Sequence, residues 1–213
     1  MIPAILDLLL RNRTVLIDLA FDIVQHIPLI TRLPGIYEVI SYEAELELQD
    51  TRGRKAIYRK RQVVRFIQDN IIAYQDTAWG DGDIFAQYRC SPGIEVDRYR
   101  EGHRYNILIS LRSTKSRGDV ETLQIERAIR DGFTAAVEEF QVEVDHRTRH
   151  FSFSLIIPGR QMPRRVTLIE QKMDKTTSLG SEHKTVLPDG RQRFTWTSER
   201  PRLFEAYILR WEW

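Results

Sequence analysis

Residues 138–158, EEFQVEVDHRTRHFSFSLIIP, decide the fold, because they contain two runs in which apolar and polar side chains alternate. Phe140, Val142 and Val144 are the apolar members of the first run, and Phe151 and Phe153 lead the second. Successive side chains of a strand point to opposite faces, so each run predicts a strand with one apolar and one solvated face. The polar residues between the runs predict a turn. The stretch therefore predicts a β-hairpin whose apolar face requires a second layer.

Other alternating runs extend this pattern along the chain. Residues 42–48 alternate apolar side chains with glutamates, and a turn over residues 50–54 leads into a basic strand that continues to about residue 66. The opposite charges of these two strands predict cross-strand ion pairs on a solvated face. Residues 120–130 fit either a strand with a bulge or a short helix, and residues 174–182 predict a polar loop.

The final segment is the most aromatic part of the chain. Tyr207, Leu209 and Trp211 share one face of a predicted strand, so we expect this strand to be buried in a sheet. The turns divide the chain into about nine to eleven short strands, without an alternation of strands and helices. This pattern predicts a mainly β fold, an antiparallel β-sandwich, with a closed β-barrel as the alternative.

Residues 1–34 predict one or two amphipathic α-helices that precede the sheets. A narrow polar stripe, which includes Asp7, Arg11 and Asp18, is surrounded by apolar side chains. A helix this apolar requires cover on more than one side, from its own domain, a second copy or a partner chain. A membrane is disfavoured as the cover, because the stripe is not rich in lysine or arginine. We expect a helical docking or oligomerisation segment over residues 1–34 and a sandwich-like domain over residues 35–213. The predicted interface residues are Ile5, Leu9, Leu16, Leu19, Ile23 and Val24.

Composition sets broad limits on function. The 32 basic and 30 acidic residues nearly balance, so total charge does not select an acidic partner. Cys90 is the single cysteine, which excludes an intrachain disulfide. The first segment has no basic leader and is interrupted by charges, so we expect a cytoplasmic protein without a membrane span.

Motifs for catalysis or metal binding are incomplete in this sequence. Asp81 and Asp83 lie in a Gly-Asp-Gly-Asp turn and could supply oxygen ligands to calcium, but the later ligands of a calcium-binding loop are missing. Cys90 precedes a Ser-Pro-Gly turn rather than a helix start, which favours a plain buried thiol over a nucleophile. We therefore assign no catalytic residue, metal ligand or cofactor, and consider an enzyme less favoured than a binding protein.

Basic loops are the remaining candidate for a ligand site. If they converged at one end of a sheet, their guanidinium groups would match a phosphate, a nucleotide or a nucleic-acid backbone. The leading hypothesis is a non-catalytic interaction module that docks through its N-terminal helix and presents loops to a ligand or partner. A nucleotide or nucleic-acid sensor is the first alternative, and a hydrolase whose site is hidden by sequence order is the second. The candidate anion-binding residues are Arg98, Arg100, Arg104, Arg112, Lys115 and Arg117.

Overall fold

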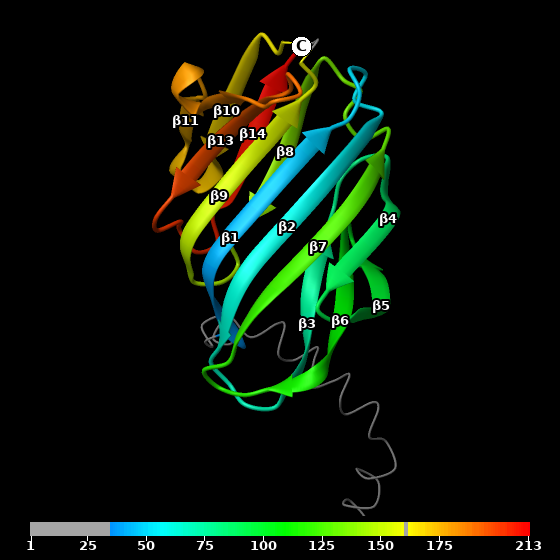
Figure 1. Cartoon of the computed structure of the whole chain (residues 1–213), viewed down its shortest axis with the longest axis vertical. Helices are drawn as coiled ribbons and strands as arrows, with labels where there is room; N and C mark the ends of the chain where they lie inside the picture. Colours follow the sequence, from blue (N-terminus) through cyan, green and yellow to red (C-terminus); the bar gives the residue numbers. More distant parts are fainter. Residues whose placement is uncertain (1–34, 160–161) are drawn as a thin grey trace, which may run out of the picture. The chain divides into compact units, whose positions relative to one another are not determined.

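The structure is a computed structural model that describes residues 35–159 and 162–213 (Figure 1). The predicted N-terminal helices lie outside the described residues, and so do all six predicted interface residues, Ile5, Leu9, Leu16, Leu19, Ile23 and Val24. Residues 36–213 form one compact unit. Its secondary structure is mainly β, which confirms the predicted class. The described residues contain no α-helix, only the short 3-10 helices η2 (Gln171–Met173) and η3 (Ser181–His183).

The largest sheet has seven strands and supplies one whole layer of the unit. Its strand order is β12-β13-β9-β1-β2-β7-β4. All neighbours are antiparallel except β1 and β9, which pair in parallel from Val39 and Thr148 onward. The prediction of an entirely antiparallel fold is therefore wrong at the centre of this sheet. The strands are β1 (Tyr37–Leu48), β2 (Lys55–Phe66), β4 (Asp83–Ser91), β7 (Val120–Arg130), β9 (Thr148–Ile157), β12 (Lys184–Val186) and β13 (Gln192–Ser198).

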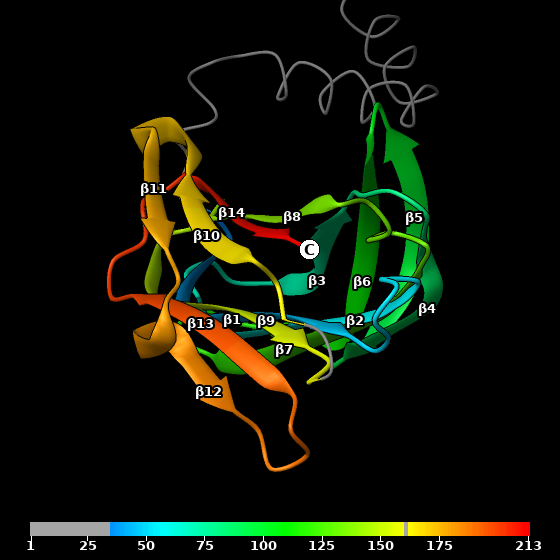
Figure 2. The ribbon, with the colours of Figure 1, turned by 90° about the horizontal axis from the view of Figure 1, so that it is seen from above.

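Two smaller sheets lie on one side of the seven-stranded sheet (Figure 2). One has the order β11-β10-β14-β8 and the other has the order β3-β6-β5. No sheet in the described part of the chain closes on itself, so the barrel alternative is wrong. The strands are β8 (Val137–Glu143), β10 (Arg165–Glu170), β11 (Lys175–Ser178) and β14 (Ala206–Glu212) in the first sheet, and β3 (Ile71–Ala78), β5 (Ile94–Glu101) and β6 (Arg104–Lys115) in the second.

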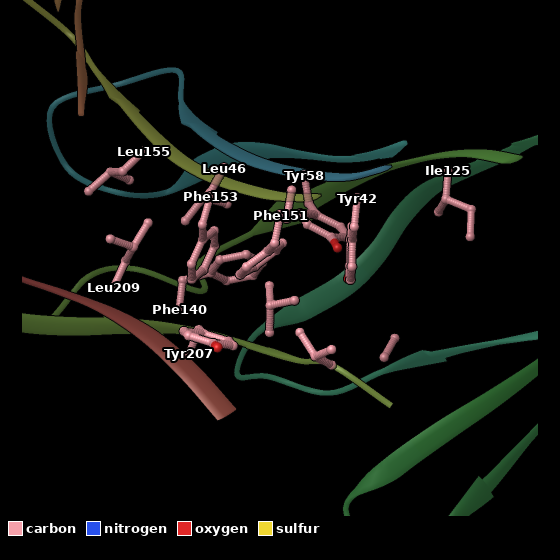
Figure 3. Packing of buried hydrophobic residues seen from close by; sticks show 14 of the residues in the cluster. Tyr42, Leu46, Tyr58, Ile125, Phe140, Phe151, Phe153, Leu155, Tyr207 and Leu209 are labelled. Atoms are coloured by element: carbon pink, nitrogen blue, oxygen red, sulfur yellow. The ribbon is translucent and has the colours of Figure 1, made fainter. Parts of the chain in front are cut away.

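Aromatic side chains fill the interior between the seven-stranded and four-stranded sheets. Phe151 and Phe153 of β9 point toward Tyr207 of β14 and Phe140 of β8 (Figure 3). The ring centroids of Phe151 and Tyr207 are 5.2 Å apart, and those of Phe140 and Phe153 are 5.8 Å apart. Trp211 is also fully buried, which confirms the predicted burial of the last strand. These contacts join the two layers, since burial of large aromatic side chains is strongly stabilising.

The predicted hairpin at residues 138–158 is wrong. β8 pairs with β14, whereas β9 pairs with β1 and β13. The chain crosses from one sheet to the other between Glu143 and Thr148. The apolar faces of β8 and β9 therefore pack against each other across the interior, and the two strands are not neighbours in one sheet. The alternation of apolar and polar residues predicts which side chains of a strand are buried. It does not show whether two such strands are hydrogen-bonded neighbours in one sheet or lie in two sheets that face each other.

The hairpin of β1 and β2 is confirmed, with the predicted turn. Leu48 pairs with Ala56, and Asp50 accepts hydrogen bonds on its Oδ1 from the backbone N–H groups of Arg52 and Arg54. Gly53 has a φ of +65°, and a Cβ on it would lie 1.5 Å from the carbonyl oxygen of Phe133. Glycine is required there both by the left-handed backbone and by this close approach.

One ambiguous segment and part of a predicted loop form strands. Residues 120–130 form β7, which pairs with β2 in unbroken register, so the helix alternative is wrong. Residues 174–182 were expected as a loop, but they include β11, which pairs with β10. β11 consists of Lys-Thr-Thr-Ser at the edge of its sheet, where one neighbour and a polar composition leave little hydrophobic signal in the sequence.

The three-stranded sheet is joined to the large sheet by a buried charged group. Lys60 of β2 donates a hydrogen bond from Nζ to Oδ1 of Asp76 on β3, at 3.0 Å. The hydroxyl of Tyr88 on β4 donates to Oδ2 of Asp76 at 3.2 Å. Burial disfavours the charged form of Lys60, but the Asp76 carboxylate outweighs this effect, and the pKa of Lys60 is raised. Asp76 is 1% exposed, so this carboxylate depends on both partners.

Candidate binding site on the seven-stranded sheet

The outer face of the seven-stranded sheet carries a hollow of about 840 Å³. This face is opposite to the core, because Ser152 and Ser154 alternate along β9 with the buried Phe151 and Phe153. Six strands contribute to the lining, so the site depends on the whole sheet and not on one loop. The polar side chains at the hollow are Arg193, Thr195, His150, Ser152, Ser154, Glu43, Glu45, Arg59, Arg61, Gln124, Glu126, Arg89 and Ser91.

Short side chains on β9 make room for the hollow. Ser152 pairs with Glu43, and Ser154 pairs with Glu45, in the parallel register of β9 and β1. The Oγ of Ser154 lies 2.9 Å from Oγ1 of Thr195 on β13, within hydrogen-bond distance. Longer side chains on the flanking strands surround these hydroxyls. The result is a depression with a hydroxyl-bearing floor and charged walls.

Arg59 is the centre of an ion-pair network across this face. Its Nη1 donates to Glu47 on β1 at 2.6 Å and to Glu45 at 3.3 Å, and its Nε donates to Glu126 on β7 at 3.1 Å. Burial disfavours the charged guanidinium, but the bonds to Glu47 and Glu126 outweigh this, and the pKa of Arg59 is raised. The predicted cross-strand charge pairing of β1 and β2 is therefore confirmed.

The network extends across the sheet from β4, at one edge, to β13, the neighbour of the other edge strand. Arg193 on β13 reaches across β9 and donates from Nη2 to Glu45 at 2.9 Å. Arg89 on β4 lies 3.7 Å from Glu126. A single exposed pair contributes less than about 1 kcal/mol, but a network holds its members in one geometry. Charges of alternating sign are thus fixed along a line from β4 to β13.

This arrangement is suited to recognition of a polar ligand. The hollow has a volume typical of sites for small molecules or a few residues of a peptide. The Nε of Arg193 is buried and has no hydrogen-bond partner among the described residues. The walls offer guanidinium donors and carboxylate acceptors in fixed positions, which favours a partner that carries both signs of charge.

Cys90 and His150 also border the hollow but have other contacts. Cys90 is partly buried against the core, and burial raises the pKa of its thiol, which disfavours the nucleophilic thiolate. The Nδ1 of His150 lies 3.2 Å from Oε1 of Glu199. The described contacts therefore pair neither residue with the other as nucleophile and base.

The first group of predicted anion-binding residues lies on the hairpin of β5 and β6. Arg98 pairs with Glu95 at 2.7 Å and stacks on the ring of Phe85 at 3.9 Å. Arg100 donates from Nε to the carbonyl of Gly102 at 2.9 Å. Arg104 donates to both carboxylate oxygens of Glu143, at 2.9 and 2.5 Å.

The second predicted group lies at the opposite end of β6. Lys115 pairs with Glu121 at 2.8 Å, and the backbone N–H of Arg117 donates to Oδ1 of Asp69. Arg112 is exposed, with a φ of +58°. Arg104 and Lys115 are the two ends of β6, which at about 3.3 Å per residue separates the two groups by about 35 Å. The structure therefore does not bring the predicted basic loops together.

The hollow was missed because it depends on strand order. The charges of β1 and β2 are visible in the sequence, but Ser154 and Arg193 join them only through the parallel pairing of β9 with β1. A detectable signal was the run Phe-Ser-Phe-Ser at residues 151–154, where the solvated face is made of small side chains. Small polar residues on a solvated strand face indicate a depression when their neighbours are long.

No group of three or more His, Cys, Asp or Glu side chains in residues 35–159 and 162–213 is arranged to hold a metal ion. No helix in the described part of the chain has the length and apolar character needed to cross a membrane. The sequence matches no known protein-family model, and a search of the curated proteins finds no significant match.

Proposed function

We propose that this protein is a non-catalytic binding module. In this proposal the stacked sheets act as a rigid, sandwich-like scaffold, the outer face of the seven-stranded sheet docks a protein partner, and residues 1–34 mediate association with a second copy or another chain. The observation that carries the proposal is the hollow over β9, enclosed by the ion-pair network of Arg59, Glu45 and Arg193.

The charge pattern of the hollow supports a protein surface as the partner. Arg59, Arg61 and Arg193 alternate with Glu43, Glu45 and Glu126 on this face. A partner with charges of both signs can exchange ion pairs with this pattern, whereas a ligand of one sign meets repulsion from half of it. A peptide segment with alternating acidic and basic side chains satisfies this requirement.

The alternatives are a nucleotide or nucleic-acid sensor and a hydrolase. A sensor of polyanions needs several unpaired cations at one place, and Arg98, Arg104 and Lys115 each have an acidic partner. A hydrolase needs a nucleophile or activated water beside a base. The contacts at the hollow favour neither alternative.

The proposal is tested by filling the hollow without changing its charges. Proteins retained by the immobilised full chain are identified, produced in pure form and titrated against the native protein and against Ser154→Trp. The indole should occupy the floor between Thr195 and Glu45 and weaken binding by about tenfold or more. Val186→Trp, at an exposed position of β12 outside the hollow, should leave binding unchanged.

Two results would contradict the proposal. One is equal binding of a purified partner to native protein and to Ser154→Trp, when circular dichroism shows that both are folded. The other is failure of the native chain to retain any protein at low salt, where attraction between charges is strongest.

A further inference from the structure

A second cavity lies inside the molecule, where the three sheets meet. It has a volume of about 100 Å³. Tyr58 of β2 and Arg127 of β7 come from the large sheet, Arg104 from β6, and Gln141 and Glu143 from β8. Arg127 points to the opposite side of the sheet from Glu126, so this cavity is separate from the hollow on the outer face.

Arg127 is a buried cation in the lining of this cavity. It is 5% exposed, yet its Nε and Nη1 atoms have no hydrogen-bond partner among the described residues. Its guanidinium lies 4.6 Å from the centroid of the Tyr58 ring, which is a favourable contact for a cation. A ring face cannot accept all the hydrogen bonds of a guanidinium, and a buried charge without acceptors is costly.

The other charged side chains at the cavity have partners. Lys60 is bound to Asp76 at 3.0 Å, and Arg104 to Glu143 by two hydrogen bonds. The Oδ1 of Asp145 lies 2.8 Å from Nδ1 of His146. Within the described part of the chain, Arg127 is therefore the cavity-lining cation whose buried N–H groups still require acceptors.

Solvent reaches the rim of the cavity but not its floor. The side chains of Arg104 and Glu143 at the rim are 37% and 29% exposed, whereas Arg127 and Tyr58 on the floor are almost fully buried. A ligand that passes the rim reaches Arg127 in a setting of low dielectric constant. Hydrogen bonds between charged groups are stronger there than at the surface.

We infer that this cavity binds a small oxyanion, a carboxylate or phosphate group, through the guanidinium of Arg127. The oxyanion supplies the acceptors that the Nε and Nη1 atoms lack, and its charge neutralises a buried cation. The volume accommodates a group of a few heavy atoms, so a larger ligand inserts its anionic group only. Its remainder then lies at the rim beside Trp79, whose ring already contacts Arg104 at 4.7 Å.

The test is a titration of the full chain with inorganic phosphate and, separately, with acetate. Chloride at matched ionic strength controls for screening. Calorimetry and thermal melting should show saturable binding of at least one oxyanion, with stabilisation that follows occupancy. Arg127→Met replaces the arginine with an unbranched apolar side chain that has no N–H donors. This variant should bind the oxyanion about tenfold or more weakly than the native protein. Arg130→Met, at an exposed position of the same strand outside the cavity, should leave it unchanged.

A second variant decides the matter if Arg127→Met does not fold. Gln141→Trp should fill the cavity from β8 and abolish oxyanion binding without altering Arg127. Absence of a saturable response to both oxyanions, a response that chloride reproduces, or full binding by the folded variants would overturn the inference. None of these results bears on partner binding at the outer face, which Ser154→Trp tests.

Discussion

Phe140 and Phe153 belong to consecutive strands of the chain, yet they meet ring against ring between two different sheets, with centroids 5.8 Å apart. Phe153 is fully buried, and Phe140 is 9% exposed. The connection between β8 and β9 therefore turns the chain from one layer to the other. This contact ties the central strand region of the large sheet to the edge strand β8 of the four-stranded sheet.

We predict that Phe153→Ala lowers the free energy of unfolding by about 3 to 5 kcal/mol, because it leaves a cavity between the two layers. Phe140→Ala should have a smaller effect. Since the rings touch, the effect of the double substitution should differ from the sum of the single effects by at least about 0.5 kcal/mol. Urea denaturation of the four proteins measures these quantities. Simple additivity would show that the two rings contribute independently.

A second prediction concerns the buried pair of Lys60 and Asp76. Lys60→Met should destabilise the protein by about 3 to 5 kcal/mol, because it leaves the Asp76 carboxylate buried with the Tyr88 hydroxyl as its remaining side-chain partner among the described residues. Combining it with Asp76→Asn removes the uncompensated charge and should recover much of the loss. Thermal and urea denaturation measure both effects. A double variant as unstable as Lys60→Met alone would show that packing, rather than charge, sets the cost.

A third prediction is loss of stability at high pH. Burial raises the pKa of Tyr42 and of Tyr58 above the ordinary value of 10.0, and burial together with Asp76 raises the pKa of Tyr88. The folded protein thus holds these protons to a higher pH than the unfolded chain does. Their contribution is fully present below about pH 10 and is lost as pH rises toward the folded pKa values.

Urea denaturation at several pH values between about 8 and 11 checks this slope. Tyrosinate absorbance should increase in two stages, first for exposed tyrosines and then together with unfolding. Tyr88→Phe is the matched control, because it removes one of the tyrosines whose pKa is raised in the folded protein and should reduce the slope. A free energy of unfolding that is flat above pH 10 would contradict the prediction.

The sequence prediction for residues 1–34 leads to a fourth experiment. A truncated chain of residues 35–213 should fold, because residues 36–213 form a compact unit with their own core. It should show a β-type circular dichroism spectrum and a cooperative melt. In light scattering, the full chain should associate and the truncated chain should be monomeric. An aggregated or molten truncated chain would indicate that residues 1–34 contribute to the core.

The full chain with Leu16 and Ile23 both changed to Glu separates association from folding. Carboxylates in the middle of an apolar contact are costly to desolvate, so this variant should lose association and keep its sheet spectrum. A full chain that is already a monodisperse monomer, with no copurifying partner or lipid, would remove the basis for the association hypothesis.

Local pattern predicted many of the strands but not their neighbours. Residues 42–66 contain a turn with Asp50 and Gly53 between two alternating runs, and the hairpin found there follows directly from short-range chemistry. The partners of β9 come from β1, far earlier in the chain, and from β13, later in it. Pairings over such distances depend on the packing of the whole core, which no local pattern encodes.

The candidate sites show the same limit. Charge on β1 and β2 predicted the ion pairs of Glu45 and Arg59, because those strands are neighbours in sequence. Arg127 was not predicted as a site residue, because residues 120–130 contain several polar side chains and the local pattern does not distinguish this arginine from them. Arg127 lines a cavity because three sheets meet around it, and its Nε and Nη1 atoms are left without acceptors among the described residues.

The position of β14 in the four-stranded sheet has a consequence for how the protein folds. β14 lies between β10 and β8, and it pairs with both. It follows them in the chain, so β8 has no strand partner in its sheet until Ala206–Glu212 has been synthesised and docked. Closing such long loops before any contact is gained slows folding. We therefore expect docking of β14 to be a late step, and β8, with the apolar face of Phe140 and Val142 uncovered, to be exposed to misassociation until that step occurs.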